Sequence, residues 1–199
     1  MLKLYYFRGE LPQADVLRAR TGGNNTVRRP ESLVWRLLLR AALEDAGMDA
    51  DLSRLALSPT GRPYLPGAAF DFSPTHTAGF VAVALSNGGT VGLDAEALRG
   101  RDISRLVRAA DRWFTPGECA RVRAALGEDQ AAAEETFLRV WTAKEALVKR
   151  TGAGLAGMRD VDCDAPQGCT LRTLLLGGTV LTVAAPHAGD VPELRQIVF

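Results

Sequence analysis

The sequence predicts a mixed α+β fold in which helices and sheets form two layers and the chain divides into two similar halves. Residues 31–47 and 137–149 each repeat apolar side chains at the spacing of one buried helix face. Residues 80–85 and 90–96 are strand-like runs on either side of the turn-forming Asn-Gly-Gly at 87–89. Each half therefore reads as a strand, a helix and a hairpin, although no repeat of individual residues proves a duplication.

Composition and charge are those of a globular protein with no broad attraction for polyanions. The 199 residues are 47% hydrophobic and 24% charged, which is ample for an apolar core. The net charge of +1 gives no general pull toward nucleic acid or membrane, so an anion site must be local. The 3 cysteines have no CxxC spacing, which favours a reducing compartment over a disulfide framework or a zinc site. Without a signal peptide or a bilayer-spanning run, the chain is expected in the cytoplasm.

The N-terminal region begins with a strand at residues 2–7 and continues into a turn-rich stretch at 21–30. This stretch carries Arg28 and Arg29 just before the helix predicted at 31–47. Arginines before and along this helix could bind phosphate groups. A solvated helix face explains the same charges, so both interpretations stay open.

Two acids stand two residues apart near the end of the strand predicted at 90–96. Successive side chains of a strand alternate, so Asp94 and Glu96 point to the same side. Two carboxylates held together repel each other unless a cation lies near them. The pair indicates a metal site, and two solvated acids at a sheet edge are the alternative.

Residues 102–126 have a helical pattern with an interruption at 114–118. Thr115 suits the N-cap of a new helix, and Pro116 suits its first position. Glu118 completes a capping box with Thr115. This block predicts a helix start and needs no chemical role.

The helix predicted at 137–149 carries the most informative charges. Glu145 and Lys149 are neighbours one turn apart, which suits a cation or phosphate site but also an ordinary surface ion pair. Lys144 falls near the middle of the apolar arc, so it must reach solvent or pair with an acid, and we expect an acidic partner. Gly152, after a basic last turn, predicts the end of the helix.

Five short blocks follow one another between about residues 60 and 155. They are Gly-Arg-Pro at 61–63, Phe-Ser-Pro-Thr-His-Thr at 72–77, Val-Gly-Leu-Asp-Ala-Glu at 91–96, Trp-Phe-Thr-Pro-Gly-Glu at 113–118 and Trp-Thr-Ala-Lys-Glu-Ala-Leu-Val-Lys at 141–149. In order and spacing the set resembles the Sfp-type 4'-phosphopantetheinyl transferases. No single block is decisive, but the ordered set is specific.

The resemblance implies the 4'-phosphopantetheinyl transferase fold, in which two α/β halves are related by pseudo-two-fold symmetry. The halves would be residues 1–89 and 90–199, with the metal-binding acids in the second and coenzyme A in the cleft between them. The implied reaction transfers the phosphopantetheine arm of coenzyme A to a serine of an acyl or peptidyl carrier protein, with Mg²⁺, and releases 3',5'-ADP. Two complete halves in one chain favour a monomer.

The resemblance also implies roles for individual residues. The acids that hold the metal in the family correspond to Asp94, Glu96 and Glu145. The groups that contact the phosphates of the coenzyme correspond to Arg62, Thr75, His76 and Lys149.

The expected catalytic residues are Asp94, Glu145 and Lys149. Glu145, directly or through a water on the metal, would take the proton of the carrier serine. Lys149 would stabilise negative charge on the pyrophosphate, and Asp94 would act through the metal. Phosphoryl transfer depends mainly on positioning and charge neutralisation, which these residue types supply.

Two positions depart from the family pattern. The usual Asn-(Leu/Ile)-Ser-His-Ser reads Ser-Pro-Thr-His-Thr at 73–77, which keeps the hydroxyls and the histidine but inserts Pro74. Glu31 stands where relatives often have an arginine. We therefore expect Arg28 or Arg29 to supply the N-terminal phosphate contact.

Two other functions remain open at this point. A non-catalytic module that binds coenzyme A or a carrier protein is favoured by the changed 73–77 motif and by Glu31. The presence of all the implied acids counts against it, because binding alone does not require them. A metal-dependent phosphohydrolase would use the same acids with water as acceptor, but the sequence offers no second metal cluster.

Overall fold

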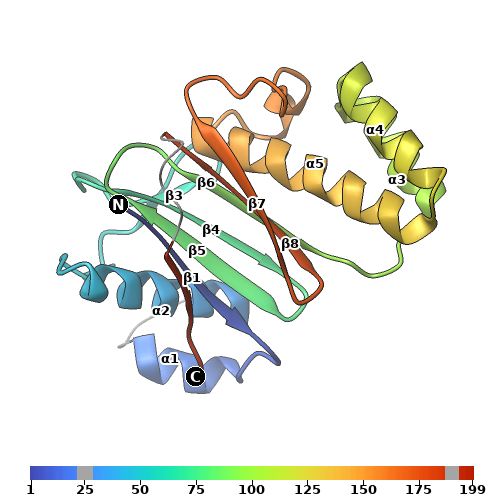
Figure 1. Cartoon of the computed structure of the whole chain (residues 1–199). Helices are drawn as coiled ribbons and strands as arrows, with labels where there is room; N and C mark the ends of the chain where they lie inside the picture. The colour runs from blue at the N-terminus through green and yellow to red at the C-terminus, as the bar shows by residue number, and fades with distance from the viewer. Residues whose placement is uncertain (22–28, 187–192) are drawn as a thin grey trace.

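The computed structural model describes residues 1–21, 29–186 and 193–199, and Figure 1 shows its elements in chain order. The helices are α1 (Ala14–Thr21), α2 (Pro30–Asp45), α3 (Ile103–Trp113), α4 (Pro116–Leu126), α5 (Gln130–Thr151) and the short 3-10 helix η1 (Leu155–Arg159). The strands are β1 (Leu2–Arg8), β2 (Ala56–Leu57), β3 (Pro63–Tyr64), β4 (Asp71–Thr77), β5 (Phe80–Ser86), β6 (Gly92–Ala97), β7 (Thr170–Leu176), β8 (Thr179–Ala185) and β9 (Glu193–Gln196).

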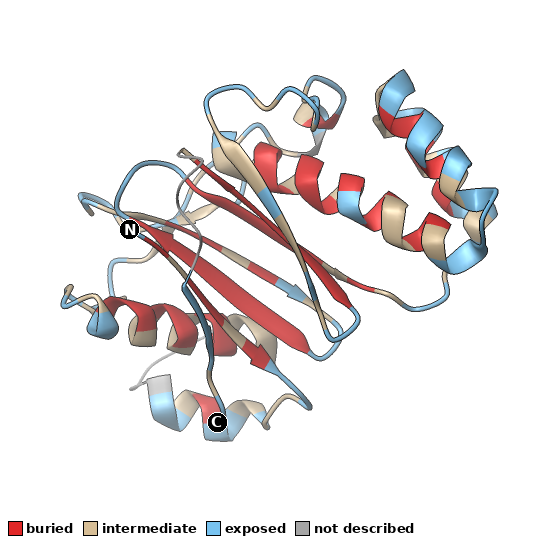
Figure 2. Cartoon of the chain, viewed as in Figure 1, coloured by how far each residue is buried: buried red, intermediate tan, exposed pale blue. Residues whose placement is uncertain are grey.

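The elements form two layered units whose sheets pack against each other. The first sheet has the order β4-β5-β1-β9 and is covered by α2, whereas the second has the order β6-β8-β7 and is covered by α5 (Figure 1). The inner faces of the two sheets meet in one apolar cluster, which includes Leu4, Phe80, Leu93 and Leu181. Figure 2 shows that the buried residues follow these strands and the sheet-facing sides of both helices. The predicted α+β class is confirmed.

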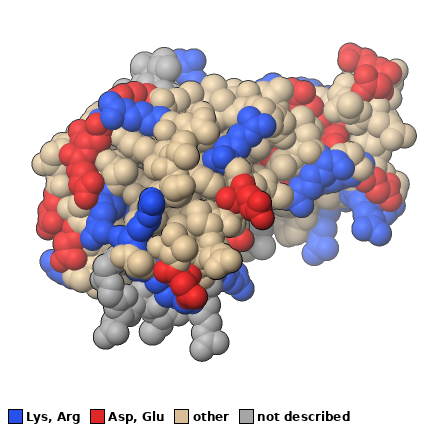
Figure 3. Space-filling view, turned by 90° about the horizontal axis from the view of Figure 1, so that it is seen from below, with Lys and Arg blue, Asp and Glu red and all other residues tan. Residues whose placement is uncertain are grey.

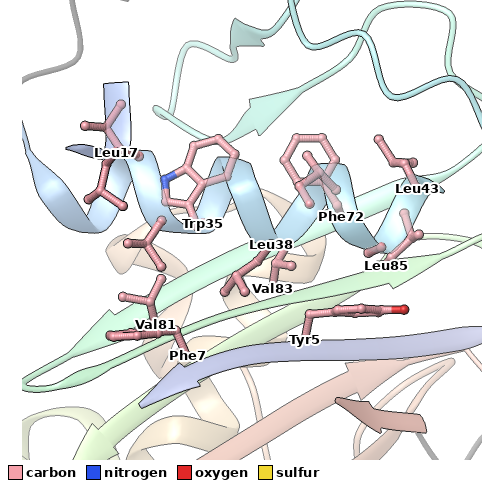
Figure 4. Close-up of a cluster of buried hydrophobic side chains, with 14 residues drawn as sticks. Tyr5, Phe7, Leu17, Trp35, Leu38, Leu43, Phe72, Val81, Val83 and Leu85 are labelled. Atoms are coloured by element: carbon pink, nitrogen blue, oxygen red, sulfur yellow. The ribbon is translucent and has the colours of Figure 1, made fainter. Parts of the chain in front are cut away.

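Helix α2 and the first sheet enclose the larger apolar core. Figure 4 shows Leu38 and Trp35 of α2 above the strands. The rings of Trp35 and Phe72 stack with their centroids 6.1 Å apart. The helix begins at Pro30, whose missing N–H is not needed in a first turn, and ends at Asp45, close to the predicted bounds.

Helix α5 buries polar groups beside its apolar ones. Lys144 and Glu118 have no exposed side-chain surface, and the Lys144 Nζ lies 3.0 Å from the Glu118 Oε2. The expected acidic partner of Lys144 is therefore confirmed. Glu118 also accepts the backbone N–H groups of Thr115 and Cys163, at 2.8 Å and 3.0 Å, so the predicted capping box is present. One carboxylate thus ties the start of α4 and the segment after η1 to α5.

Both units run through a strand, a helix and a hairpin. In the first unit β1 and α2 precede the hairpin β4–β5, and in the second β6 and α5 precede the hairpin β7–β8. The hairpin predicted between residues 80–85 and 90–96 is wrong, because β5 pairs with β4 and β1, whereas β6 pairs with β8. The chain crosses between sheets before Gly92, where an added Cβ would lie 1.9 Å from the Ala146 carbonyl oxygen. Glycine lets β6 start directly against α5.

The last strand returns to the first unit. Strand β9 pairs in parallel with β1, although its residues belong to the expected second half. Asp45, at the end of α2, accepts hydrogen bonds from Tyr5 and Arg195, both at 2.6 Å, and pairs with Lys3. These contacts join α2, β1 and β9. Figure 3 shows acidic and basic side chains spread together over the face seen from below. Within the described residues no helix has the length and apolarity needed to cross a membrane.

Candidate active site

A pocket of ≈ 640 Å³ is lined by residues of both units. Of the five sequence blocks, those at 61–63, 72–77, 91–96 and 141–149 contribute lining residues. The block at 113–118 contributes no lining residue. Its Glu118 instead forms the buried ion pair with Lys144. The lining includes Arg29, Ser32, Trp35, Arg36, Arg62, Ser73, Pro74, Thr75, His76, Asp94, Glu96, Glu145 and Lys149.

Asp94 and Lys149 form an ion pair in this pocket. Asp94 projects from β6 and is 7% exposed, and the Lys149 Nζ lies 2.7 Å from its Oδ1. The same ammonium group donates a hydrogen bond to the Leu93 carbonyl oxygen at 3.1 Å. Helix α5 and strand β6 place these groups together because Gly92 allows their backbones to touch.

Glu96 is held by an arginine that the sequence interpretation did not assign. The Arg101 Nη2 lies 2.6 Å from the Glu96 Oε2, and its Nη1 lies 3.0 Å from the Glu134 Oε1. Glu134 also accepts the backbone N–H groups of Arg99 and Gly100. A carboxylate near the start of α5 thus orders the loop after β6.

Glu145 differs from the two strand acids in its partners. Among the described residues it makes no hydrogen bond and no ion pair, although it lines the pocket and is partly buried. Burial raises its pKa, the charge of Asp94 raises it further, and Lys149 opposes the change. The pKa of Glu96 is also raised, by burial first, against the lowering effect of Arg101. A carboxyl group with a raised pKa, and without a partner in the described part of the chain, is suited to accept a proton.

The three acids fit a divalent cation in chemistry but are not arranged around a common point. Within the described residues no three His, Cys, Asp or Glu side chains form a group ready to hold a metal ion. Asp94 and Glu96 are bonded instead to Lys149 and Arg101. All three acids nevertheless line the same pocket, the charge of Asp94 raises the pKa of both Glu96 and Glu145, and oxygen ligands of this kind suit Mg²⁺.

The first unit contributes basic residues to the pocket. The Arg36 guanidinium stacks on the Trp35 ring, 4.3 Å from its centroid, and donates to the Ser32 carbonyl oxygen. Arg29 precedes α2 and is exposed. Arg28, the other predicted phosphate contact, lies outside the described residues.

Arg62 lines the pocket and also joins the two units. It donates hydrogen bonds to the Asp71 Oδ2 at 2.5 Å, to the Val91 carbonyl oxygen at 2.9 Å and to the Arg150 carbonyl oxygen at 2.9 Å. These acceptors come from β4, from the chain before β6 and from the end of α5. The pocket is therefore braced by a residue that was expected to bind the coenzyme.

The block at 72–77 lies on β4 and turns alternate side chains to different surroundings. His76 is exposed and lines the pocket, whereas Thr75 is 4% exposed and accepts the Ala95 N–H at 3.1 Å. Pro74 also lines the pocket. Strand β4 is at the edge of its sheet, where a proline is tolerated because an edge strand has an unpaired side. The inserted proline therefore fits the fold.

Sequence reasoning did not assign Trp35, Arg36 and Arg101 to the site. Trp35 has no predicted role, and Arg36 is one of the helix arginines for which phosphate binding and a solvated helix face are both left open. The neighbouring Trp-Arg pair, which stacks in the structure, was the available signal. Arg101 gave no signal, because its pairing with Glu96 and Glu134 depends on the path of a loop.

The geometry supports one kind of chemistry. The basic residues of the pocket can hold a polyanion, its acidic oxygens can hold a divalent cation, and Glu145 can take a proton. The pocket is large enough for a nucleotide-sized ligand, since ligand sites usually measure about 300–1,000 Å³. Nucleophilic catalysis by a cysteine is not supported, because Cys119, Cys163 and Cys169 do not line the pocket.

Comparisons with known proteins agree with this chemistry. The model of the 4'-phosphopantetheinyl transferase superfamily matches residues 90–183. A 4'-phosphopantetheinyl transferase AcpT of Salmonella typhimurium is 34% identical over 179 residues, which cover 89% of this chain and 85% of the relative. AcpT of Escherichia coli K12 is 29% identical over 80% of this chain and 76% of its own length. A 4'-phosphopantetheinyl transferase of Bacillus subtilis is 26% identical over 63% of this chain and 53% of its own length.

Proposed function

This chain belongs to the 4'-phosphopantetheinyl transferase superfamily, and on that premise we propose that it transfers the phosphopantetheine arm of coenzyme A to a serine of an acyl or peptidyl carrier protein. The products are the modified carrier and 3',5'-ADP. The observation that carries this proposal is the half-buried Glu145, which has a raised pKa and no hydrogen-bond or ion-pair partner among the described residues, beside the Asp94–Lys149 pair. A proton acceptor next to a charged pair is what transfer to a hydroxyl group requires.

The proposed step conserves atoms and charge. The serine oxygen forms a bond to the phosphorus atom that carries the pantetheine arm. The bond from this phosphorus to the bridging oxygen breaks, and the bridging oxygen leaves with 3',5'-ADP. The serine proton passes to the Glu145 carboxylate. The ion pair with Asp94 holds the Lys149 ammonium group in the pocket, where it can stabilise negative charge on the phosphate oxygens.

Asp94, Glu96 and Glu145 would hold Mg²⁺, which neutralises negative charge on the pyrophosphate when it is bound. Arg62, Thr75 and His76 line the pocket and are proposed to contact the coenzyme. Arg29, at the N-cap of α2, and Arg36 also line the pocket and add basic groups for the coenzyme. The two halves, residues 1–89 and 90–199, each contribute one side of the site. We also propose that the protein acts as a monomer in the cytoplasm, in keeping with its free cysteines.

A non-catalytic binding module remains the second candidate, and one observation favours it. Asp94 and Glu96 already form ion pairs with Lys149 and Arg101, so these two acids need no metal ion to balance their charge. Glu145 has no such partner among the described residues. A module that only binds its ligand does not need an unpaired carboxylate in the pocket. The transferase is therefore the stronger proposal.

The test is to incubate the protein with coenzyme A, Mg²⁺ and a panel of unmodified carrier proteins and to weigh the carriers by intact-protein mass spectrometry. The proposal predicts a mass gain of one phosphopantetheine on at least one carrier. Consumption of coenzyme A without a heavier carrier would indicate a hydrolase, and no change in either would indicate a binding module. Both results would contradict the proposal.

A further inference from the structure

We propose that a row of side-chain acceptors on β4 fixes the position of the acids on β6, and that Ser73 and Thr77 are positioning residues of the site. Four side chains of β4 accept four backbone N–H groups at or just before β6. The donor–acceptor pairs are Val91 to Asp71 at 2.7 Å, Leu93 to Ser73 at 3.0 Å, Ala95 to Thr75 at 3.1 Å and Ala97 to Thr77 at 3.3 Å. Each pair is separated by 20 residues in the chain, so the contacts run in register. We call these four contacts the acceptor ladder.

The acceptor ladder replaces a missing neighbouring strand. Strand β6 uses one edge to pair with β8, and its other edge faces β4 of the other sheet. The two strands share no backbone pairing, so the N–H groups at this edge need other acceptors. Every second side chain of β4 provides one. Asp, Ser and Thr are suited to this because their oxygens lie close to the backbone.

Water cannot readily replace the two central contacts. Ser73 is 3% exposed and Thr75 is 4% exposed, and Leu93 and Ala95 are almost fully buried. An N–H group left without an acceptor in such surroundings carries its full desolvation penalty. The two central rungs are therefore a strict condition on the placement of β6, and the part-buried rungs at Asp71 and Thr77 extend the ladder at its two ends.

The acids of the pocket lie between the rungs. Asp94 is flanked by the rungs at Leu93 and Ala95, and Glu96 by the rungs at Ala95 and Ala97. A shift of the strand by one residue would turn both acids to the opposite face. The rung at Ser73 thus fixes the backbone just before Asp94, and the rung at Thr77 fixes the backbone just after Glu96. Neither Ser73 nor Thr77 has a role in the proposed chemistry.

Neighbouring groups keep the ladder itself in place. Arg62 holds Asp71 at one end by a 2.5 Å ion pair. At the other end the Arg99 guanidinium donates to the Thr77 Oγ1 at 2.9 Å, so Thr77 also orders the loop that leads to Arg101. Because Arg101 binds Glu96, a change at Thr77 reaches this acid by two routes.

The ladder is tested by amide hydrogen exchange in Ser73→Ala and Thr77→Val, which remove one acceptor each. We expect the N–H of Leu93 in the first variant and of Ala97 in the second to exchange about tenfold faster than in the wild type, because each loses its acceptor. Thr77→Ser keeps the hydroxyl and should restore protection. The matched control is Thr173→Val, which removes a partly buried hydroxyl that contacts Thr182 in the second sheet. Unchanged protection of Leu93 and Ala97 would overturn the ladder.

The positioning role rests on the proposed function and has a separate readout. Binding of Mn²⁺, used as a probe for Mg²⁺, and kcat should both fall several-fold in Ser73→Ala and Thr77→Val, whereas KM for coenzyme A changes less. Thr77→Ser and Thr173→Val should keep wild-type values. Faster exchange with unchanged Mn²⁺ binding and kcat would overturn the positioning role. Failure of the wild type to modify any carrier would contradict the proposed function, while the exchange data would still decide the ladder.

Discussion

Helices α2 and α5 occupy the same place in their units, yet they bury different side chains. Each follows the first strand of its unit and covers a sheet. The buried residues of α2 are all apolar, whereas α5 buries Glu134, Thr142 and Lys144 as well. Glu134 fixes the loop after β6, and Lys144 fixes Glu118. The first unit is therefore held mainly by apolar packing, and the second uses buried polar contacts to place the elements around its acids.

The largest expected effect is on chemistry in the second unit. Glu145→Gln removes the proposed proton acceptor, and the transfer rate should fall by about 10²–10⁴-fold, the usual contribution of a general base. Binding of coenzyme A, followed by calorimetry, should change much less. The control is Glu135→Gln, which removes a carboxylate of α5 that pairs with Arg139. A fully active Glu145→Gln enzyme would refute both the proton-acceptor and the metal role of this residue.

The next effect concerns the contact between α5 and β6. Gly92→Ala places a methyl group against a backbone oxygen that cannot move aside, so we expect a loss of about 3 kcal/mol or more in the free energy of unfolding. Gly117→Ala is the control, because its Cβ meets nothing within 4 Å and its φ is not positive. This second variant should match the wild type or exceed it slightly. Equal urea midpoints for both variants would show that α5 and β6 are less tightly joined than described.

The buried ion pair gives the third test of the difference between the two helices. Lys144→Met leaves Glu118 buried without its cation, and we expect a destabilisation of about 3–5 kcal/mol. In α2, Leu38→Met exchanges one fully buried apolar side chain for another and should cost less than about 1.5 kcal/mol. Denaturant unfolding measures both. If the two substitutions have the same effect, the polar contacts of α5 contribute no more than ordinary packing.

A smaller effect is expected on the thermal stability of Glu145→Gln, which should rise although the transfer rate falls. The pKa of Glu145 is raised in the folded protein, so its ionised form is disfavoured by folding. At neutral pH, Glu145→Gln should therefore melt at a higher temperature than the wild type. The difference should shrink as the pH falls through the raised pKa toward the ordinary value, where the carboxyl group is protonated in both states. Thermal melts of both proteins at several pH values give this curve, and a variant less stable at neutral pH would contradict it.

Asp45 in the first unit should show the opposite sign and the smallest effect. Its hydrogen bonds from Lys3 and Tyr5 and its pairing with Arg195 lower its pKa to about 2. The ionised carboxylate therefore contributes stability above the ordinary pKa, and this contribution is lost as the pH falls through about 2. Asp45→Asn should melt slightly below the wild type at neutral pH, and the two should converge at the acidic end. A constant difference at all pH values would show that Asp45 acts through packing.

Much of the fold follows from local patterns in the sequence. The bounds of α2, the capping box at Thr115 and the stop at Gly152 each depend on residues close together in the chain, and each is confirmed. The buried partner of Lys144 could be predicted as an acid because a buried ammonium group requires one. Its identity as Glu118 could not, because that depends on how α4 packs on α5.

The errors have a common physical origin. Two strand-like runs around Asn-Gly-Gly predicted a hairpin, but the second run packs against α5 instead. This close packing requires glycine at position 92, where a Cβ would clash with Ala146, and the sequence of the turn does not reveal such a tertiary contact. Helix α1 was not predicted, and the pairing of β9 with β1 joins the two ends of the chain. The Thr75 hydroxyl is predicted as a phosphate ligand, yet in the structure it accepts an N–H group of β6, as do the hydroxyls of Ser73 and Thr77. Side chains with two possible partners cannot be assigned before the strands are placed.

The central claim is that Asp94, Glu96 and Glu145, on two elements of the second unit, take up a single divalent ion beside a bound pyrophosphate. Electron paramagnetic resonance of Mn²⁺ added with coenzyme A measures this directly. The wild type is predicted to bind the ion in a way that requires the coenzyme, and Asp94→Asn with Glu145→Gln is predicted to abolish binding. Equal Mn²⁺ binding by the wild type and this double variant would contradict the account.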